Sequence, residues 1–101
     1  MAIVEVSVVP IGTSTPSVSR YVARAIQILR EQSAVKYELT AMGTIIEGDL
    51  EQVMTLVKEM HRSAFNEGVQ RVVTTIKIDE RRDKPATIDS KVTSVHQKLK
   101  R

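Results

Sequence analysis

The sequence predicts an α+β fold in which two helices cover one face of a four-stranded antiparallel sheet. Three observations predict it: β-branched residues alternate along four segments, apolar residues recur at helical spacing in three others, and turn-forming residues separate them. The order is β-α-β-β-α-β followed by a C-terminal helix. Two strand–helix–strand halves with right-handed crossovers give the ferredoxin-like sandwich. We expect residues 1–101 to form a single such domain, because 101 residues leave no room for a second.

The first strand is predicted over residues 2–11, because the segment AIVEVSVVPI is rich in β-branched residues and alternates. Proline cannot donate to a strand ladder, so the strand is expected to end near Pro10 or to lie at an edge there. One face of the strand is expected to carry Val4, Val6 and Val8.

The first helix is predicted to follow the turn-forming loop 12–17 and to run to about Gln32. Thr15 offers an N-cap with Pro16 at the first helical position, and Ser17 is an equally good cap. One helical face carries an apolar stripe of Val18, Tyr21, Val22, Ala25 and Leu29.

A β-hairpin is predicted next. Residues 35–40 alternate strictly, residues 41–43 make a turn, and residues 44–47 pair back as the third strand. Glu47 is unusual, because it is a carboxylate inside an apolar strand, next to Gly48. Its side chain is expected either to face solvent at an edge or to be the charged anchor of a small-ligand pocket.

The second helix has the clearest start signal. Asp49 is expected to cap it, with Gln52 reaching back in a capping box, and Gly68 to supply a left-handed stop. Its core stripe is predicted to be Leu50, Val53, Val57, Met60 and Ala64. A long fourth strand over residues 69–79 and a last helix carrying Ile88, Val92, Val95 and Leu99 complete the domain.

The two helices would leave the second face of the sheet open. Alternation mixes apolar and polar residues on that face: Ile3, Val9, Ile45 and Val73 with Glu5, Ser7, Glu47, Thr75 and Lys77. A half-apolar face of this kind is typical of an association surface. The last helix of the same chain is one candidate cover, and a second subunit is the one we prefer.

Composition excludes several functions. Cysteine is absent and only two histidines are present, so we predict no disulfide and no metal site. Aromatic residues make up 3%, and the densest charged run, residues 79–84, sums to zero, which argues against nucleic-acid binding. No signal peptide and no apolar stretch near the roughly 18 residues of a membrane span are visible, so we expect a cytoplasmic protein with no membrane partner.

No catalytic motif stands out. The four glycines form neither a dinucleotide fingerprint nor a P-loop, and no nucleophile elbow is present. Polar side chains gather instead in the loop before the first helix and in the hairpin, where hydroxyls commonly serve as caps and turn residues. We therefore predict a protein that is not an enzyme and that has no cofactor.

Four segments carry a family resemblance: SVVPIGT from Ser7, SVSRYVA from Ser17, KYELTAMGTIIEG from Lys36 and RVVTTIKIDERRD from Arg71. Together with the terminal KVTSVHQKLK, they resemble the small thiamine-binding protein family in type and order over nearly the whole chain. The resemblance implies a ferredoxin-like fold, assembly into homodimers and homotetramers through sheet faces, and binding of thiamine or its hydroxymethylpyrimidine portion without catalysis.

The resemblance also directs attention to a candidate ligand site. A carboxylate such as Glu47 would accept from the amino group or balance the thiazolium, so that Glu47→Gln would weaken binding. An aromatic ring would stack on the ligand, and Met42 would adapt to its edge. The candidate ligand-binding residues are Ser17, Ser19, Tyr21, Tyr37, Thr40, Met42, Gly43, Thr44 and Glu47.

Two other functions remain open from the residues alone. One is a ligand-free structural or regulatory oligomer, in which the polar loop only caps helices. The other is an amino-acid-sensing module of the same fold, which would bind its effector between subunits.

Overall fold

The computed structural model describes residues 1–99 and confirms the ferredoxin-like order of elements. The sheet is antiparallel, with strand order β2-β3-β1-β4. The elements are β1 (Ala2–Ile11), α1 (Ser19–Arg30), β2 (Lys36–Thr40), β3 (Gly43–Gly48), α2 (Leu50–Ser63), the 3-10 turn η1 (Phe65–Glu67), β4 (Arg71–Glu80) and α3 (Ile88–Leu99).

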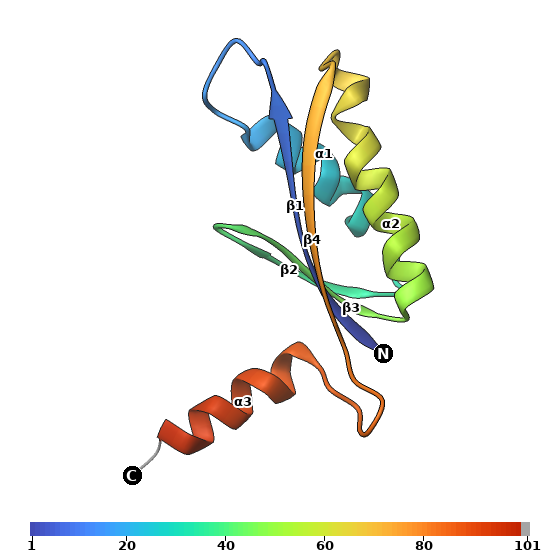
Figure 1. Ribbon diagram of the computed structural model, residues 1–101, viewed down its shortest axis with the longest axis vertical. Helices are drawn as coiled ribbons and strands as arrows, with labels where there is room; N and C mark the ends of the chain where they lie inside the picture. Colours follow the sequence, from blue (N-terminus) through green and yellow to red (C-terminus); the bar gives the residue numbers. More distant parts are fainter. Residues whose placement is uncertain (100–101) are drawn as a thin grey trace.

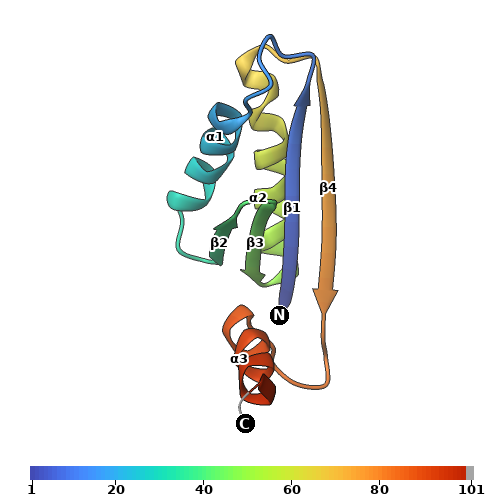
Figure 2. The ribbon, with the colours of Figure 1, turned by 90° about the vertical axis from the view of Figure 1, so that its left-hand side faces the viewer.

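Helices α1 and α2 pack against the same face of the sheet, and Figure 2 looks onto the opposite, open face. The core lies between the sheet and these two helices, because the alternation of β1 turns Val4 and Val6 toward the helices. From the helices come Leu29 of α1 and Val53 and Val57 of α2, all at most 1% exposed. These residues belong to the predicted stripes, so the hydrophobic pattern identified the core correctly.

The start of α1 differs from the prediction. The helix begins at Ser19, its N-cap is Val18, and no side chain caps it. The Thr13 hydroxyl instead donates to the Thr15 carbonyl at 2.7 Å, and the Thr15 hydroxyl accepts from the Ser17 N–H at 3.3 Å. Such local hydroxyl bonds stabilise turns in competition with the helix. The expectation that Thr15 or Ser17 caps the helix was therefore wrong, and the helix ends at Arg30 rather than near Gln32.

The predicted signals at the two ends of α2 are largely confirmed. The Asp49 carboxylate accepts from the Gln52 N–H at 3.2 Å, which forms one half of the capping box. Gly68 has a φ of +87°, the left-handed conformation expected of a stop. It ends the 3-10 turn η1, which continues from α2 after Ser63.

Strand β1 is longer than its neighbour β3, and this difference leaves part of its edge open. On one side β1 pairs with β4 over all ten residues, whereas β3 pairs only with Ala2–Val6 (Figure 2). A Cβ on Gly43 would lie 3.0 Å from the Val6 carbonyl oxygen, so the backbone groups of Val6 face the β3 side. Because these directions alternate along a strand, the N–H and C=O of Val8 face the same side, beyond the end of β3.

Pro10 occupies the next position on this open edge. The strand runs on through Pro10 to Ile11, so the proline lies at an edge instead of ending the strand. The ladder with β4 stays continuous because, by the same alternation, the missing N–H of Pro10 is on the side away from β4.

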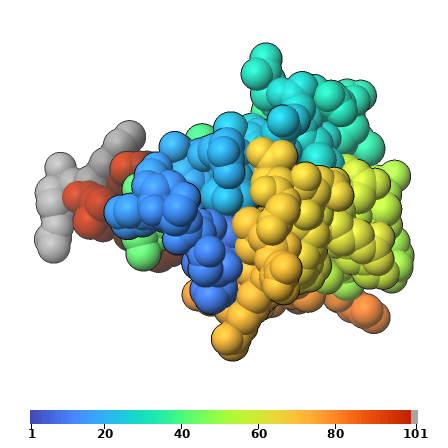
Figure 3. Space-filling model, turned by 90° about the horizontal axis from the view of Figure 1, so that it is seen from above, coloured from blue at the N-terminus to red at the C-terminus, as the bar shows by residue number. Residues whose placement is uncertain are grey.

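Helix α3 extends from the body of the domain (Figures 1 and 3). It lies beyond the ends of the strands when the open face of the sheet is viewed face-on (Figure 2). No residue of α3 is buried, and its stripe is exposed: Val92 by 49%, Val95 by 58% and Leu99 by 69%. The structure therefore does not bear out the less favoured alternative, in which the last helix of the same chain covers this face. Val9 and Val73 on the open face also remain 41% and 45% exposed.

Candidate functional site

A cavity of about 790 Å³ lies where α1, the upper half of β1 and the tip of the β2–β3 hairpin meet. It exists because the pairing of β3 with β1 reaches only to Val6. No strand therefore fills the space next to Ser7, Val8 and Val9. One face of α1 forms the opposite wall, with Val22 and Ile26 at its centre. The size and the mainly apolar lining are typical of small-molecule sites.

Six of the nine predicted ligand-binding residues line this cavity: Ser17, Ser19, Thr40, Met42, Gly43 and Thr44. They come from two segments far apart in the sequence, the start of α1 and the hairpin tip. Thr44 is 4% exposed and pairs with Val6 across the strands, so its side chain is on the helix-facing side of the sheet. Met42, at the hairpin turn, is 84% exposed. The fold therefore brings together the two polar groups that the sequence left separate.

Two of these residues also have a local structural role. The Thr40 hydroxyl donates to the Gly43 carbonyl at 2.8 Å and accepts from the Met42 N–H at 3.3 Å. This is the turn function that hydroxyls commonly have beside a hairpin. Gly43 lets the hairpin tip approach β1, since a side chain there would press on the Val6 carbonyl. The hairpin tip therefore lies close to β1 at Val6.

The two tyrosines lie outside the cavity. Tyr21 is 7% exposed, its hydroxyl accepts from Arg20 Nη2 at 3.0 Å, and the Arg20 guanidinium lies 5.0 Å from its ring centroid. That ring face is therefore already covered by a cation. Tyr37 pairs with Ile46 and packs partly against the core.

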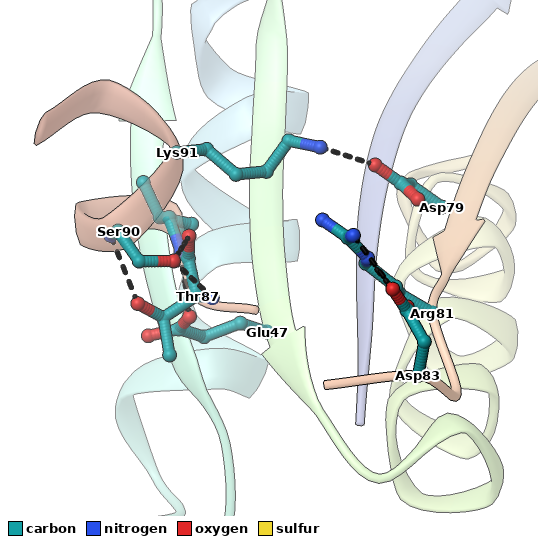
Figure 4. Close-up of polar contacts among 8 residues, drawn as sticks. Glu47, Asp79, Arg81, Asp83, Thr87, Ser90 and Lys91 are labelled. Atoms are coloured by element: carbon teal, nitrogen blue, oxygen red, sulfur yellow. Dashed lines mark hydrogen bonds and ion pairs between the residues drawn. The ribbon is translucent and has the colours of Figure 1, made fainter. Parts of the chain in front are cut away.

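Glu47 lies at the far end of β3, on the open side of the sheet, and does not line the cavity. It is 7% exposed, and its Oε2 accepts from the backbone N–H of Ile88 at 2.9 Å (Figure 4). The carboxylate thus binds the first N–H of α3, where the positive end of the helix dipole favours an anion. Lys91 Nζ and the Asp79 carboxylate, 2.7 Å apart, make a second contact between α3 and the sheet. Neither of the two surroundings expected for Glu47 included this role.

The sequence missed Val8, Leu39 and Arg30, all of which line the cavity. Val8 was placed on one face of the first strand with Val4 and Val6, and Arg30 falls outside the apolar stripe of α1. The signal that could have found them is strand length: a ten-residue first strand cannot be paired along its full length by a short hairpin strand. The residues of the first strand that extend beyond the hairpin then border a space that no strand fills.

A second, shallower groove of about 430 Å³ lies between α1 and α2. Several of its polar residues already have partners within the protein. Glu67, with a side chain 18% exposed, lies 3.7 Å from Arg20 and 3.5 Å from Arg24, and Gln27 donates to Glu31 at 3.0 Å. These contacts tie η1 to α1 and leave the groove a weaker candidate than the cavity.

Residues 1–99 contain no group of three or more metal-ligating side chains, and no helix within them is long and apolar enough to cross a membrane. His61 contacts Thr74 instead, with Nδ1 2.6 Å from the hydroxyl oxygen, and its ring meets Phe65 edge-on at 5.5 Å. This histidine therefore joins α2 to β4.

Comparison with known proteins identifies the family of the chain. Residues 4–96 match the family model described as thiamine-binding protein. The chain is 47% identical over 102 residues to the protein YqgV of Bacillus subtilis (strain 168), and the match covers 98% of both chains.

Two solved structures share the fold. The hypothetical protein MJ1052 of Methanocaldococcus jannaschii superposes with a TM-score of 0.86 at 42% identity, over 95% of this chain and 96% of that one. The Thermotoga maritima protein TM0486, named for a suspected role in thiamine biosynthesis or salvage, gives 0.76 at 29% identity over 93% and 97%. Because the family model spans nearly the whole sequence, this chain belongs to the thiamine-binding protein family.

Proposed function

We propose that the chain binds thiamine or its hydroxymethylpyrimidine portion, without chemical change, in the cavity between α1, β1 and the hairpin. The open edge of β1 at Val8 is the observation that carries the proposal, because it offers a backbone donor and acceptor to a largely apolar cavity. The family to which the chain belongs supports the choice of ligand.

The chemistry of an aminopyrimidine fits this edge. Its amino group donates next to a ring nitrogen that accepts, and an unpaired strand residue presents the complementary carbonyl and N–H. In this arrangement the Val8 carbonyl accepts from the amino group and the Val8 N–H donates to the ring. The Thr44 and Ser19 hydroxyls supply further hydrogen bonds, and Val22 and Met42 contact the faces of the ring.

The predicted roles of Tyr21, Tyr37 and Glu47 gain no support from this geometry, because these side chains do not line the cavity. Contact of Tyr21 and Tyr37 with a ligand stays a prediction, whereas the bond of Glu47 to Ile88 favours a structural role for this carboxylate. The six residues of the start of α1 and the hairpin tip keep their proposed roles.

A binding role without turnover is supported by the side chains at hand. The residues that line the cavity within residues 1–99 are apolar, hydroxyl-bearing or amide, together with one arginine. Carboxylates and histidines, which serve most often as general bases, lie elsewhere in the described chain.

We also propose that the protein is a homo-oligomer in which a second copy covers the open sheet face and the stripe of α3. Both surfaces expose apolar residues, and within one chain of this structure they do not cover each other. Because every copy carries both surfaces, the α3 stripe of each copy can cover the sheet face of the other in one symmetric interface. A cytoplasmic location stays a prediction.

Titration calorimetry of the purified protein with thiamine and with hydroxymethylpyrimidine tests the binding proposal. Thr44→Val removes one hydroxyl from the cavity, so we expect affinity to fall about 2- to 12-fold for a loss of about 0.5–1.5 kcal/mol. Thr55→Val, on the exposed side of α2, is the matched control and should leave affinity unchanged.

A thermal-shift screen distinguishes the other functions. A ligand that binds only the folded state raises stability by RT ln(1 + [L]/Kd). A shift with common amino acids but not with either pyrimidine would instead support an amino-acid sensor. No shift with any of these compounds would contradict the proposal and favour a ligand-free oligomer.

A further inference from the structure

Arg30, in the last turn of α1, carries the formal charge of the cavity. Among the residues of the described chain that line it, no carboxylate is present and no second cation. The other lining residues are apolar or carry neutral polar groups such as the Ser19 hydroxyl and the Gln27 amide. The cavity is therefore electrostatically positive at the Arg30 end.

Arg30 also differs from the other arginines of the same helix. Arg20 and Arg24 both contact Glu67 across the helix layer, at 3.7 and 3.5 Å. Arg30 follows Arg24 by six residues, which turns its side chain to a different face of the helix. No carboxylate of residues 1–99 lies within 4.0 Å of the Arg30 guanidinium. Its five donors are thus available to an anion that enters the cavity.

The length of the cavity along α1 indicates how far the anionic group of a ligand has to lie from its pyrimidine ring. Ser19 and Arg30 both line the cavity and are eleven residues apart in one helix, which places their Cα atoms about 16 Å apart along the axis. A single pyrimidine ring spans little more than one helical turn, about 5.4 Å, and would fill only part of this length. A ligand that binds at the β1 edge and reaches Arg30 needs a longer body.

We propose that the cavity selects phosphate monoesters that carry the aminopyrimidine, with Arg30 binding the phosphate, and that thiamine monophosphate fits its length best. This inference rests on the binding function proposed above. A guanidinium matches phosphate oxygens in a bidentate fork. The phosphate also neutralises the thiazolium, which would otherwise bring a second positive charge into a cavity without a carboxylate.

The test compares four ligands by titration calorimetry: thiamine, thiamine monophosphate, hydroxymethylpyrimidine and hydroxymethylpyrimidine phosphate. The wild-type protein is expected to bind thiamine monophosphate at least tenfold more tightly than thiamine. Arg30→Gln should weaken binding of the monophosphate about 10- to 100-fold, the range of a lost charge-assisted contact. The affinity for thiamine should stay unchanged or rise, because a positive charge near the thiazolium is removed. Arg30→Lys keeps the charge but loses the fork, so an intermediate loss is expected.

Arg24→Gln is the matched control, because it removes the same charge from the same helix at a site outside the cavity. It should change neither affinity by more than twofold. Equal binding of thiamine and its monophosphate by the wild type, or equal losses for both ligands in Arg30→Gln, would overturn the inference while leaving the binding function in place. Absence of binding by all four compounds would instead contradict the binding function itself. Tighter binding of the shorter phosphate would keep the role of Arg30 and overturn the choice of thiamine monophosphate.

Discussion

Glu47, near the end of β3, accepts a hydrogen bond from the backbone N–H of Ile88, 41 residues later, at 2.9 Å (Figure 4). The bond joins the sheet to the first residue of α3, and the Lys91–Asp79 ion pair at 2.7 Å reinforces the junction. Helix α3 is thus positioned by polar contacts, while its apolar stripe faces solvent.

Glu47→Gln is expected to loosen α3 without affecting the cavity. The amide can still accept from Ile88, but a neutral hydrogen bond is about half as strong as a charge-assisted one. The free energy of unfolding should fall by about 1 kcal/mol. Hydrogen exchange of the amides at the start of α3 should accelerate, while thiamine affinity stays unchanged. A tenfold loss of affinity with unchanged exchange would return Glu47 to the ligand site.

Gly48→Ala is expected to destabilise the fold by about 1–3 kcal/mol through overpacking. A Cβ at this position would lie 2.8 Å from Val35 Cγ1, well inside van der Waals contact. The double variant Gly48→Ala with Val35→Ala should lose less than the sum of the two single variants, because the shortest contact, with Val35 Cγ1, is removed. Denaturant unfolding measures all three. Additive losses would show that the strain arises elsewhere.

Charged residues on the stripe of α3 are expected to break the proposed oligomer. In the double variant Val92→Glu with Val95→Glu, light scattering should give a species near the monomer mass of 11.3 kDa. Ser94→Glu with Gln97→Glu adds the same charge to the opposite side of the helix and should keep the wild-type mass. A wild-type protein that is monomeric at high micromolar concentration would contradict the oligomer directly.

Asp83 is expected to titrate below its usual range. The hydrogen bonds from the Arg81 guanidinium, at 2.6 and 2.7 Å, lower the pKa of the Asp83 carboxyl from its ordinary 3.8. Because the folded-state pKa is lowered, the contact stabilises this loop above the unfolded pKa and is lost as the pH falls through the folded pKa. An NMR titration should place the midpoint below 3.8 in the wild type and return it toward 3.8 in Arg81→Gln. Equal midpoints in the two proteins would exclude the pair in solution.

The sequence predicted the fold well because its periodic patterns are governed by the same burial that the structure shows. Val53, Val57 and Met60 recur at helical spacing and are buried. The alternating residues of β1 pair with those of β4 at all ten positions of the strand. The start of α1 could not be predicted, since Thr15 and Ser17 are suited both to capping a helix and to forming the turn that they actually form.

The candidate site was predictable in composition but not in geometry. The hydroxyls of the first loop and of the hairpin could be recognised as polar groups in the sequence. That they line one cavity depends on where the pairing of β3 with β1 stops, which is at Val6. Glu47 was singled out because it is a carboxylate in an apolar strand. Its partner is the backbone N–H of a residue 41 positions later, in α3. Because every residue except proline has a backbone N–H, the sequence does not indicate which one binds Glu47.

The open edge of β1 also bears on the solubility of the protein. An exposed strand edge invites pairing with a strand of another molecule, and the resulting sheets can grow into aggregates. Here the exposed stretch is short, and Pro10 follows Val8 on the same edge with no N–H to offer. An incoming strand would lose its ladder after a single residue. A compound the size of a vitamin needs only that one residue, so the proline disfavours strand pairing at this edge while leaving the cavity open to small molecules.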